Sequence, residues 1–248
     1  MKHTIAQRTL PAFSSACLAL ALAGCGGNDP APGVRTMGGS AASLMPVPMT
    51  PVQALPYEDA VHHIYVAYFG RPAEMPGMAY WDRQLGLAQA PLEAAGMPAR
   101  YRTSSQVRSI LDAFASSAES QHLYPGTGAQ FIEGVYRNLF NRTADEAGLN
   151  WWRNAIDSGA VTRSEAALTI LLGARNEDLL CVRNKIAVAH AFYRILNERP
   201  EFLPLYTGER NTELVRRMMA KVDARSDLAA FEAVIRATIA EMGGIIRA

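Results

Sequence analysis

The sequence has few cysteines, almost no net charge and, beyond its first 24 residues, no long apolar run. Three cysteines in 248 residues exclude a disulfide scaffold. The formal net charge is +1, and it becomes −1 without residues 1–24, which carry Lys2, Arg8 and no acid. We therefore expect no nucleic-acid partner. The apolar stretches after Gly24 are far shorter than the roughly 18 to 20 residues of a membrane-spanning helix, so we expect none in the mature chain.

The first residues have the layout of a bacterial lipoprotein signal peptide. A positive start is followed by an apolar run and then by small residues just before Cys25. The segment Leu22–Cys25 resembles the lipobox, in which the cysteine is acylated and cleavage occurs before it. We predict lipidation at Cys25, with palmitate-type acyl chains that anchor the protein stably in a membrane. The resemblance favours the outer membrane because no aspartate follows the cysteine, and it leaves open which face the domain occupies.

Composition and helical periodicity together predict four parts in the precursor chain. Residues 1–24 form the signal peptide, and residues 25–56 form a lipid-anchored linker rich in proline and glycine that lacks the apolar content for a core. Residues 57–198 show helical periodicity throughout, and residues 199–248 form a C-terminal helical extension. No alternating strand pattern is present. The predicted fold class is therefore all-α.

The helical domain contains an internal repeat. A stripe of apolar residues at helical spacing in residues 61–69 recurs in residues 132–140, and Tyr65 and Tyr136 are 71 residues apart. The 17-residue segments 65–81 and 136–152 have the same residue at six positions. We predict two related three-helix units, unit one at residues 57–120 and unit two at residues 128–198. The repeat-motif residues to which we assign a structural role are Tyr65, Phe69, Arg71, Gly77, Trp81, Tyr136, Phe140, Arg142, Asp145, Gly148, Trp151 and Trp152.

Local signals place the helix ends. Gly70 and Asn141 suit left-handed caps that end the first helix of each unit. Capping boxes at Thr143–Glu146 and Thr162–Glu165, and Thr103 with Gln106, predict helix starts. Gly77 and Gly148 predict close approach of another backbone, and Tyr80–Trp81 and Trp151–Trp152 predict aromatic plugs. Unit one carries an insertion near residues 86–102. Further helices are predicted over 179–196, 211–222 and, capped by Ser226, 227–242.

The pattern from Tyr136 to Trp152, followed by Asn184–Val188, closely resembles the domain-of-unknown-function 4214 family. That family is bacterial and exported, and it distantly resembles phycobilisome linker domains. The resemblance covers residues 57–196, most specifically the half from Phe131 onward. It implies a non-catalytic interaction or scaffolding module of the cell envelope, with no catalytic residues to transfer.

The repeated charged residues admit two interpretations. Arg71 and Arg142 could clasp an anionic sugar or carboxylate, and the sequence favours local ties to carbonyls and acids. Glu74 and Asp145 could be calcium ligands, and capping with charge pairing is favoured because the loop offers few oxygens. The tryptophans and tyrosines could stack on a glycan, and core packing is favoured at their helical spacing.

Other chemical signals are weak. The histidines of the predicted mature chain lack the paired spacing of a zinc protease helix, so we expect no metal site. No sequence pattern indicates a cofactor. Gly126 and Gly128 lack the lysine of a phosphate loop and predict a helix-start turn. Cys181 is the single thiol expected in the mature protein, interpreted as a small buried residue, with a reactive nucleophile as the alternative.

Two classes of function remain. The first is a membrane-anchored lipoprotein with a non-catalytic helical interaction module, whose partner is another envelope protein or a surface polysaccharide. The second is an envelope glycan-binding or glycan-hydrolysing protein that uses carboxylates among Glu119, Asp145, Glu146 and Glu177. A hydrolase needs two carboxylates about 5 to 10 Å apart across an open cleft. We expect no catalytic residues.

Overall fold

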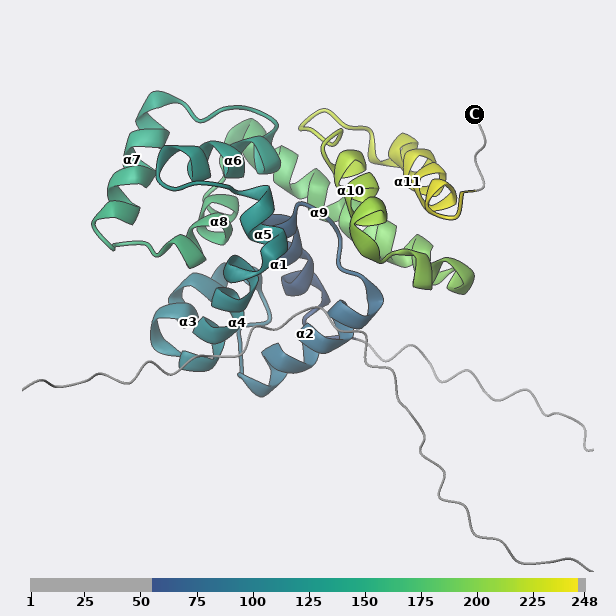
Figure 1. The fold of residues 1–248 in the computed structure, drawn as a ribbon, viewed down its shortest axis with the longest axis horizontal. Coiled ribbons are helices and arrows are strands. Elements are labelled where there is room, and N and C mark those ends of the chain that lie inside the picture. The colour runs from purple at the N-terminus through teal and green to yellow at the C-terminus, as the bar shows by residue number, and fades with distance from the viewer. Residues whose placement is uncertain (1–54, 245–248) are drawn as a thin grey trace, which may run out of the picture. The chain divides into compact units, whose positions relative to one another are not determined.

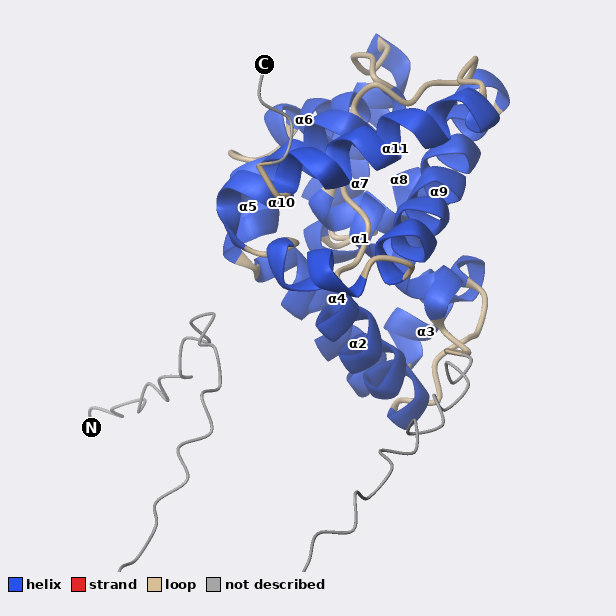
Figure 2. Ribbon diagram, turned by 90° about the vertical axis from the view of Figure 1, so that its right-hand side faces the viewer, coloured by secondary structure: helices blue, strands red, loops and turns tan. Residues whose placement is uncertain are grey.

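A computed structural model describes residues 55–244, and within that range the protein is all-α, as predicted. Eleven α-helices and two 3-10 helices are present there, with no strand (Figure 2). The predicted signal peptide, Cys25 and nearly all of the predicted linker lie outside the described residues. None of the helices between residues 55 and 244 combines the length and apolar character needed to cross a bilayer.

Unit one contains the first helices of the chain. The 3-10 helix η1 and the short helix α3 occupy the predicted insertion. Tyr101 and Arg102 of α3 reach unit two, where Tyr101 accepts a hydrogen bond from Thr162 at 3.0 Å and Arg102 donates to Glu165 at 3.1 Å. The insertion therefore connects the two units. The elements are α1 (Glu58–Phe69), α2 (Met75–Leu87), η1 (Ala94–Gly96), α3 (Met97–Thr103), α4 (Ser105–Ser116) and α5 (Ala118–Leu123).

Unit two repeats this order of helices without the insertion that forms η1 and α3. The C-terminal extension follows it. Helix α9 covers the predicted 179–196 helix and extends it at both ends, and α10 begins and ends three residues before the predicted 211–222 helix. The elements are α6 (Ala129–Phe140), α7 (Glu146–Asp157), α8 (Arg163–Leu172), α9 (Asn176–Asn197), η2 (Pro200–Leu205), α10 (Gly208–Met219) and α11 (Leu228–Met242).

Helix ends follow from identifiable caps. Gly70 and Asn141 adopt left-handed backbone conformations, with φ of 64° and 57°, and end α1 and α6 as predicted. Thr162 and Glu165 form the predicted capping box. Gly128 precedes α6, which agrees with the predicted helix-start turn.

Three predicted caps were misplaced. Asp145, not Thr143, caps α7, because its carboxylate accepts the Gly148 amide at 2.8 Å. Ser104 caps α4 where Thr103 was predicted, and Asp227 caps α11 where Ser226 was predicted. In each case a neighbouring side chain also has a capping oxygen, and spacing alone does not decide which one the backbone uses.

One hydrophobic core joins both units and the extension. Helix α1 lies among the other helices and packs on α2, α4, α5, α6, α8 and α9 (Figure 1). Helices α10 and α11 lie beside each other, and α11 packs along α9. The extension is thus placed to cover part of unit one.

Candidate functional site

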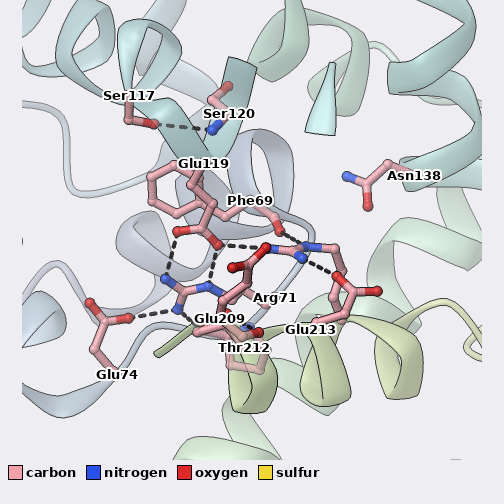
Figure 3. A network of polar contacts seen from close by, with 12 residues as sticks. Phe69, Arg71, Glu74, Ser117, Glu119, Ser120, Asn138, Glu209, Thr212 and Glu213 are labelled. Atoms are coloured by element: carbon pink, nitrogen blue, oxygen red, sulfur yellow. Dashed lines mark hydrogen bonds and ion pairs between the residues drawn. The ribbon is translucent and has the colours of Figure 1, made fainter. Parts of the chain in front are cut away.

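In unit one, Arg71 stands just after α1 at the centre of a polar network (Figure 3). Its Nε and Nη2 donate to the two oxygens of Glu119, at 2.6 and 2.9 Å, in a bidentate ion pair. Its Nη1 donates to Glu74 at 2.6 Å and to the Pro72 carbonyl at 3.2 Å. All three nitrogens of the planar guanidinium group therefore donate to an acceptor.

Unit two reproduces the bidentate ion pair and the carbonyl contact around Arg142, with a longer contact to the local acid. Its Nε and Nη2 donate to the two oxygens of Asp178, at 2.9 and 2.6 Å. Its Nη1 donates to the Thr143 carbonyl at 2.9 Å and lies 3.8 Å from Asp145. The predicted ties to a local carbonyl and a local acid are present in both units. The bidentate partner was not predicted, because Glu119 and Asp178 lie 48 and 36 residues from their arginines at the start of a later helix.

Both guanidinium groups also lie against aromatic rings of the first helix. The central carbon of Arg71 is 5.3 Å from the Tyr65 ring centre and 5.4 Å from that of Phe69. The corresponding distances for Arg142 are 5.2 Å to Tyr136 and 5.9 Å to Phe140. These distances are within the range of cation–π attraction, about 6 Å. The repeated tyrosine and phenylalanine therefore support the repeated arginine.

The repeated glycines both lie against tyrosine side chains, and the contact is tighter at Gly77 than at Gly148. A Cβ added at Gly77 would collide with the Tyr65 hydroxyl and with Glu74, and one added at Gly148 would stand 3.1 Å from the Tyr136 hydroxyl. The expectation that another backbone approaches these glycines was wrong. The close neighbour is the tyrosine of the preceding helix, whose ring extends beneath the second helix.

Only the second aromatic residue of each predicted pair packs inside. Trp81 lies against Phe114, with ring centres 4.4 Å apart, and Trp152 is 9% exposed. Tyr80 and Trp151, at equivalent positions, are 55% and 59% exposed. The prediction of an aromatic plug holds for Trp81 and Trp152 and is wrong for their neighbours, because adjacent helical residues point about 100° apart.

The two arginine sites differ in their cover. In unit one, the Tyr206 hydroxyl accepts from Arg71 Nη1 at 3.4 Å and donates to the Pro72 carbonyl at 2.7 Å. Arg216 of α10 adds a second cation on Glu119 at 2.8 Å. The Arg71 side chain is left 6% exposed, whereas that of Arg142 is 42% exposed. The C-terminal extension thus covers the arginine of unit one, whereas in unit two its α10–α11 loop borders the site and leaves Arg142 open.

In unit two the site opens into a groove of about 570 Å³. Three arginines and three acids line it, so it presents both charges to a ligand. Its floor is Cys181, whose thiol donates to the Leu139 carbonyl at 3.4 Å and whose pKa is raised by burial. Cys181 is buried, as predicted. The lining residues are Phe140, Asn141, Arg142, Arg175, Asn176, Glu177, Asp178, Cys181, Asp223, Ala224 and Arg225.

The acids considered for hydrolysis have other partners or stand apart. Glu119 is shared between Arg71 and Arg216, Asp145 caps α7, and Glu177 faces Arg225 at 3.7 Å. Glu146 is exposed in the first turn of α7. The amide of Gly148 lowers the pKa of Asp145, the opposite of the shift that a general acid requires.

A second cluster, which the sequence analysis missed, lies at the start of α1. Glu58 and His62 of α1 meet His190 of α9, with one potential ligand atom from each lying within 4.8 Å of the others. The histidines are not paired at helical spacing within one helix, which is the pattern of a zinc protease. The available signal was the Glu58–His62 spacing of four residues, and only the fold brings His190 to it.

These features define an all-α protein with two arginine-centred repeat units, of which the second remains open. Residues 111–179 match the family model of a domain of unknown function, DUF4214. The predicted resemblance is confirmed over this segment, which runs from α4 into α9 and includes Arg142, Asp145 and Asp178. No curated protein and no solved structure matches the chain.

Proposed function

We propose that this protein is a bacterial lipoprotein of the outer membrane, anchored through Cys25, whose helical domain is a non-catalytic interaction module of the cell envelope. The partner is a polar segment of another envelope protein, which binds in the groove beside Arg142. The anchor rests on the lipobox-like sequence before Cys25.

The observation that carries the interaction role is the difference in cover between the two arginine sites. In unit one, a tyrosine hydroxyl and an arginine from the C-terminal extension complete the site. In unit two the same arginine geometry borders an open groove. Arginine is well suited to such an interface because its planar fork binds acceptors with defined geometry. A partner segment would supply in unit two the polar contacts that the extension supplies in unit one.

The carboxylate contacts favour binding over hydrolysis. Glu119 and Asp145 are both engaged in structural contacts, and the hydrogen bond from Gly148 keeps Asp145 in its charged form. A hydrolase would require one carboxyl group with a raised pKa beside a second one in an open cleft.

Carbohydrate binding is the second candidate, and it is favoured by Tyr80 and Trp151. Both rings are exposed at equivalent positions of the repeat, as expected for platforms that stack on sugar rings. Trp151→Ala should abolish retention by the host's surface polysaccharide if this candidate is correct. Unchanged retention, or none in the parent protein, would eliminate it.

The test of the protein-partner proposal is site-specific crosslinking in the native host. A photoreactive amino acid replaces Arg225, at the rim of the groove, and in a control it replaces Arg83, an exposed arginine of α2. We expect a discrete crosslinked envelope protein from position 225 and not from position 83. Arg175→Glu should weaken that crosslink, whereas Arg83→Glu should not. Equal products from both positions would contradict the proposal.

Cys25→Ala provides the control for anchoring. The variant should fold, leave the membrane fraction and lose the crosslink. Retention of the variant in membranes would contradict the lipoprotein assignment without affecting the groove.

A further inference from the structure

The most unusual buried polar side chain is His62, which lies in α1 with no exposed surface. Neither of its ring nitrogens has a hydrogen-bond partner. Leaving a buried polar group without a hydrogen-bond partner costs free energy, and natural proteins contain few such groups. Two such atoms on one ring require an explanation.

The surroundings of His62 supply other groups that bind metals. Glu58 lies one turn before His62 on the same helix, and His190 approaches from α9 with its ring centre 4.5 Å from that of His62. Nδ1 of His190 is 3.1 Å from a Glu58 oxygen. Ligand atoms from these three residues lie within 4.8 Å of one another.

We propose that Glu58, His62 and His190 bind a divalent transition-metal ion of the zinc type. Two imidazole nitrogens and one carboxylate oxygen are a donor set that zinc prefers. The ion would satisfy one of the two unpartnered nitrogens of His62. Glu58 and His190 are only partly buried, so the ion has a path from solvent, and a fourth position remains for water.

Asp59 fits the role of a positioning residue. Its carboxylate lies 3.1 Å from Nε2 of His190, on the side of the ring opposite the nitrogen that faces Glu58. Metal-binding histidines generally donate their second N–H to a carboxylate, which fixes the tautomer and orients the ring. With Nδ1 on the metal and Nε2–H donating to Asp59, His190 would have this arrangement.

The protonation of the two histidines is compatible with metal binding. Burial, followed by the neighbouring His190, lowers the pKa of His62 to about 3, so its imidazole is neutral at physiological pH. The hydrogen bond to Asp59 raises the pKa of His190. A metal ion binds an imidazole nitrogen that carries no proton, so any proton between Nδ1 of His190 and Glu58 is released to solvent when the ion binds. The site then holds one divalent cation, two carboxylates and two neutral imidazoles, with no net charge.

The site shares no residue with the groove, which is lined by the end of α6 with Arg142, the first turns of α9 and the α10–α11 loop. It would join the first turn of α1 to the middle of α9. Failure of one proposal does not affect the other.

The experiment is Zn²⁺ titration by calorimetry of the full-length lipoprotein in detergent, purified through a tag without histidine. We expect one Zn²⁺ per chain and a raised Tm, and Co²⁺ should give the absorption of a nitrogen- and oxygen-ligated ion. His190→Gln, at a partly exposed position that should tolerate the change, should lower the affinity at least about tenfold, and Asp59→Asn should lower it about 10- to 100-fold.

His122→Gln, at an exposed histidine of α5, is the matched control and should leave binding unchanged. The proposal is overturned if the parent protein binds no Zn²⁺, or if His190→Gln and His122→Gln bind as the parent does. Folding of each variant is checked by circular dichroism, so that loss of binding is assigned to loss of the ligand.

Discussion

Arg142 holds Asp178 through the same two nitrogens with which Arg71 holds Glu119, although one pair is exposed and the other is covered by the C-terminal extension. The repeat has therefore preserved a contact geometry while the environment of that geometry has changed. This difference has measurable consequences for stability.

Arg71→Met should destabilise the protein by about 3 to 5 kcal/mol, because it leaves the partly buried carboxylates of Glu119 and Glu74 with reduced compensation. Arg142→Met, at the equivalent exposed position, should cost about 1 kcal/mol or less. Urea unfolding followed by circular dichroism measures both. Equal losses would show that the cover over Arg71 has no energetic role.

Replacement of the two adjacent tryptophans of α7 should affect stability to very different extents. Trp152→Ala removes a buried ring and should cost about 3 to 5 kcal/mol. Trp151→Ala removes an exposed ring and should change the free energy of unfolding by about 0.5 kcal/mol or less. Thermal and urea unfolding of both variants provide the comparison. A loss below 1 kcal/mol at position 152 would place that ring on the surface.

Gly77→Ala should be destabilising although alanine favours helices, because its Cβ would collide with the Tyr65 hydroxyl and Glu74. Gly86→Ala in the same helix is the control: its Cβ would meet only Tyr57 at an ordinary 3.6 Å, and the change should stabilise by up to about 1 kcal/mol. Denaturant midpoints report both effects.

Removal of the tyrosine hydroxyl tests the cause. In the Tyr65→Phe background, Gly77→Ala should cost less than it does in the parent protein, and a double-mutant cycle gives the coupling. Simple additivity of the two changes would indicate that the tyrosine does not set the requirement for glycine.

Lys185 should make stability depend on pH above neutrality. Its ammonium group is buried and donates to the Asn138 carbonyl and, at 2.9 Å, to Asn141. Burial lowers the pKa of Lys185 from 10.5 to about 8. Between these values the unfolded chain binds more protons than the folded one, so stability should rise with pH from about 8 to 10.5.

The gain attributable to Lys185 across that window is about 3 kcal/mol, from 1.36 kcal/mol per pKa unit. The measurement is the difference in the free energy of unfolding between the parent protein and Lys185→Met at several pH values. Subtraction removes the contributions of other groups that titrate in both proteins. A difference that stays constant with pH would mean that Lys185 keeps its ordinary pKa.

Much of the helical architecture was predictable because the signals are local. The apolar stripes around Tyr65 and Tyr136 identified α1 and α6, and the residues suited to left-handed caps marked their ends. The start of α7 was misplaced because Thr143 and Asp145 both carry capping oxygens. Both ends of α10 were predicted three residues too late. Its N-cap residue, Thr207, makes no side-chain cap hydrogen bond, so no distinct cap marks where the helix begins.

The candidate sites were only partly predictable. The repeated arginines, tyrosines and glycines were found by their spacing, but Asp178 was not identified as the partner of Arg142, since ion pairs between distant segments leave no periodic signal. The cluster of His62 and His190 was missed for the same reason, because the two histidines are 128 positions apart in the sequence.

The sequence by itself determined the helical class, the two related units and the residues that each unit repeats, because helix periodicity and caps depend on neighbours within a few positions. The tertiary structure decided which copy is covered, which tryptophan of a pair is buried and which histidine meets Glu58. These properties depend on how the extension and α9 pack against distant helices. Two related local sequences therefore became one buried structural site and one open groove.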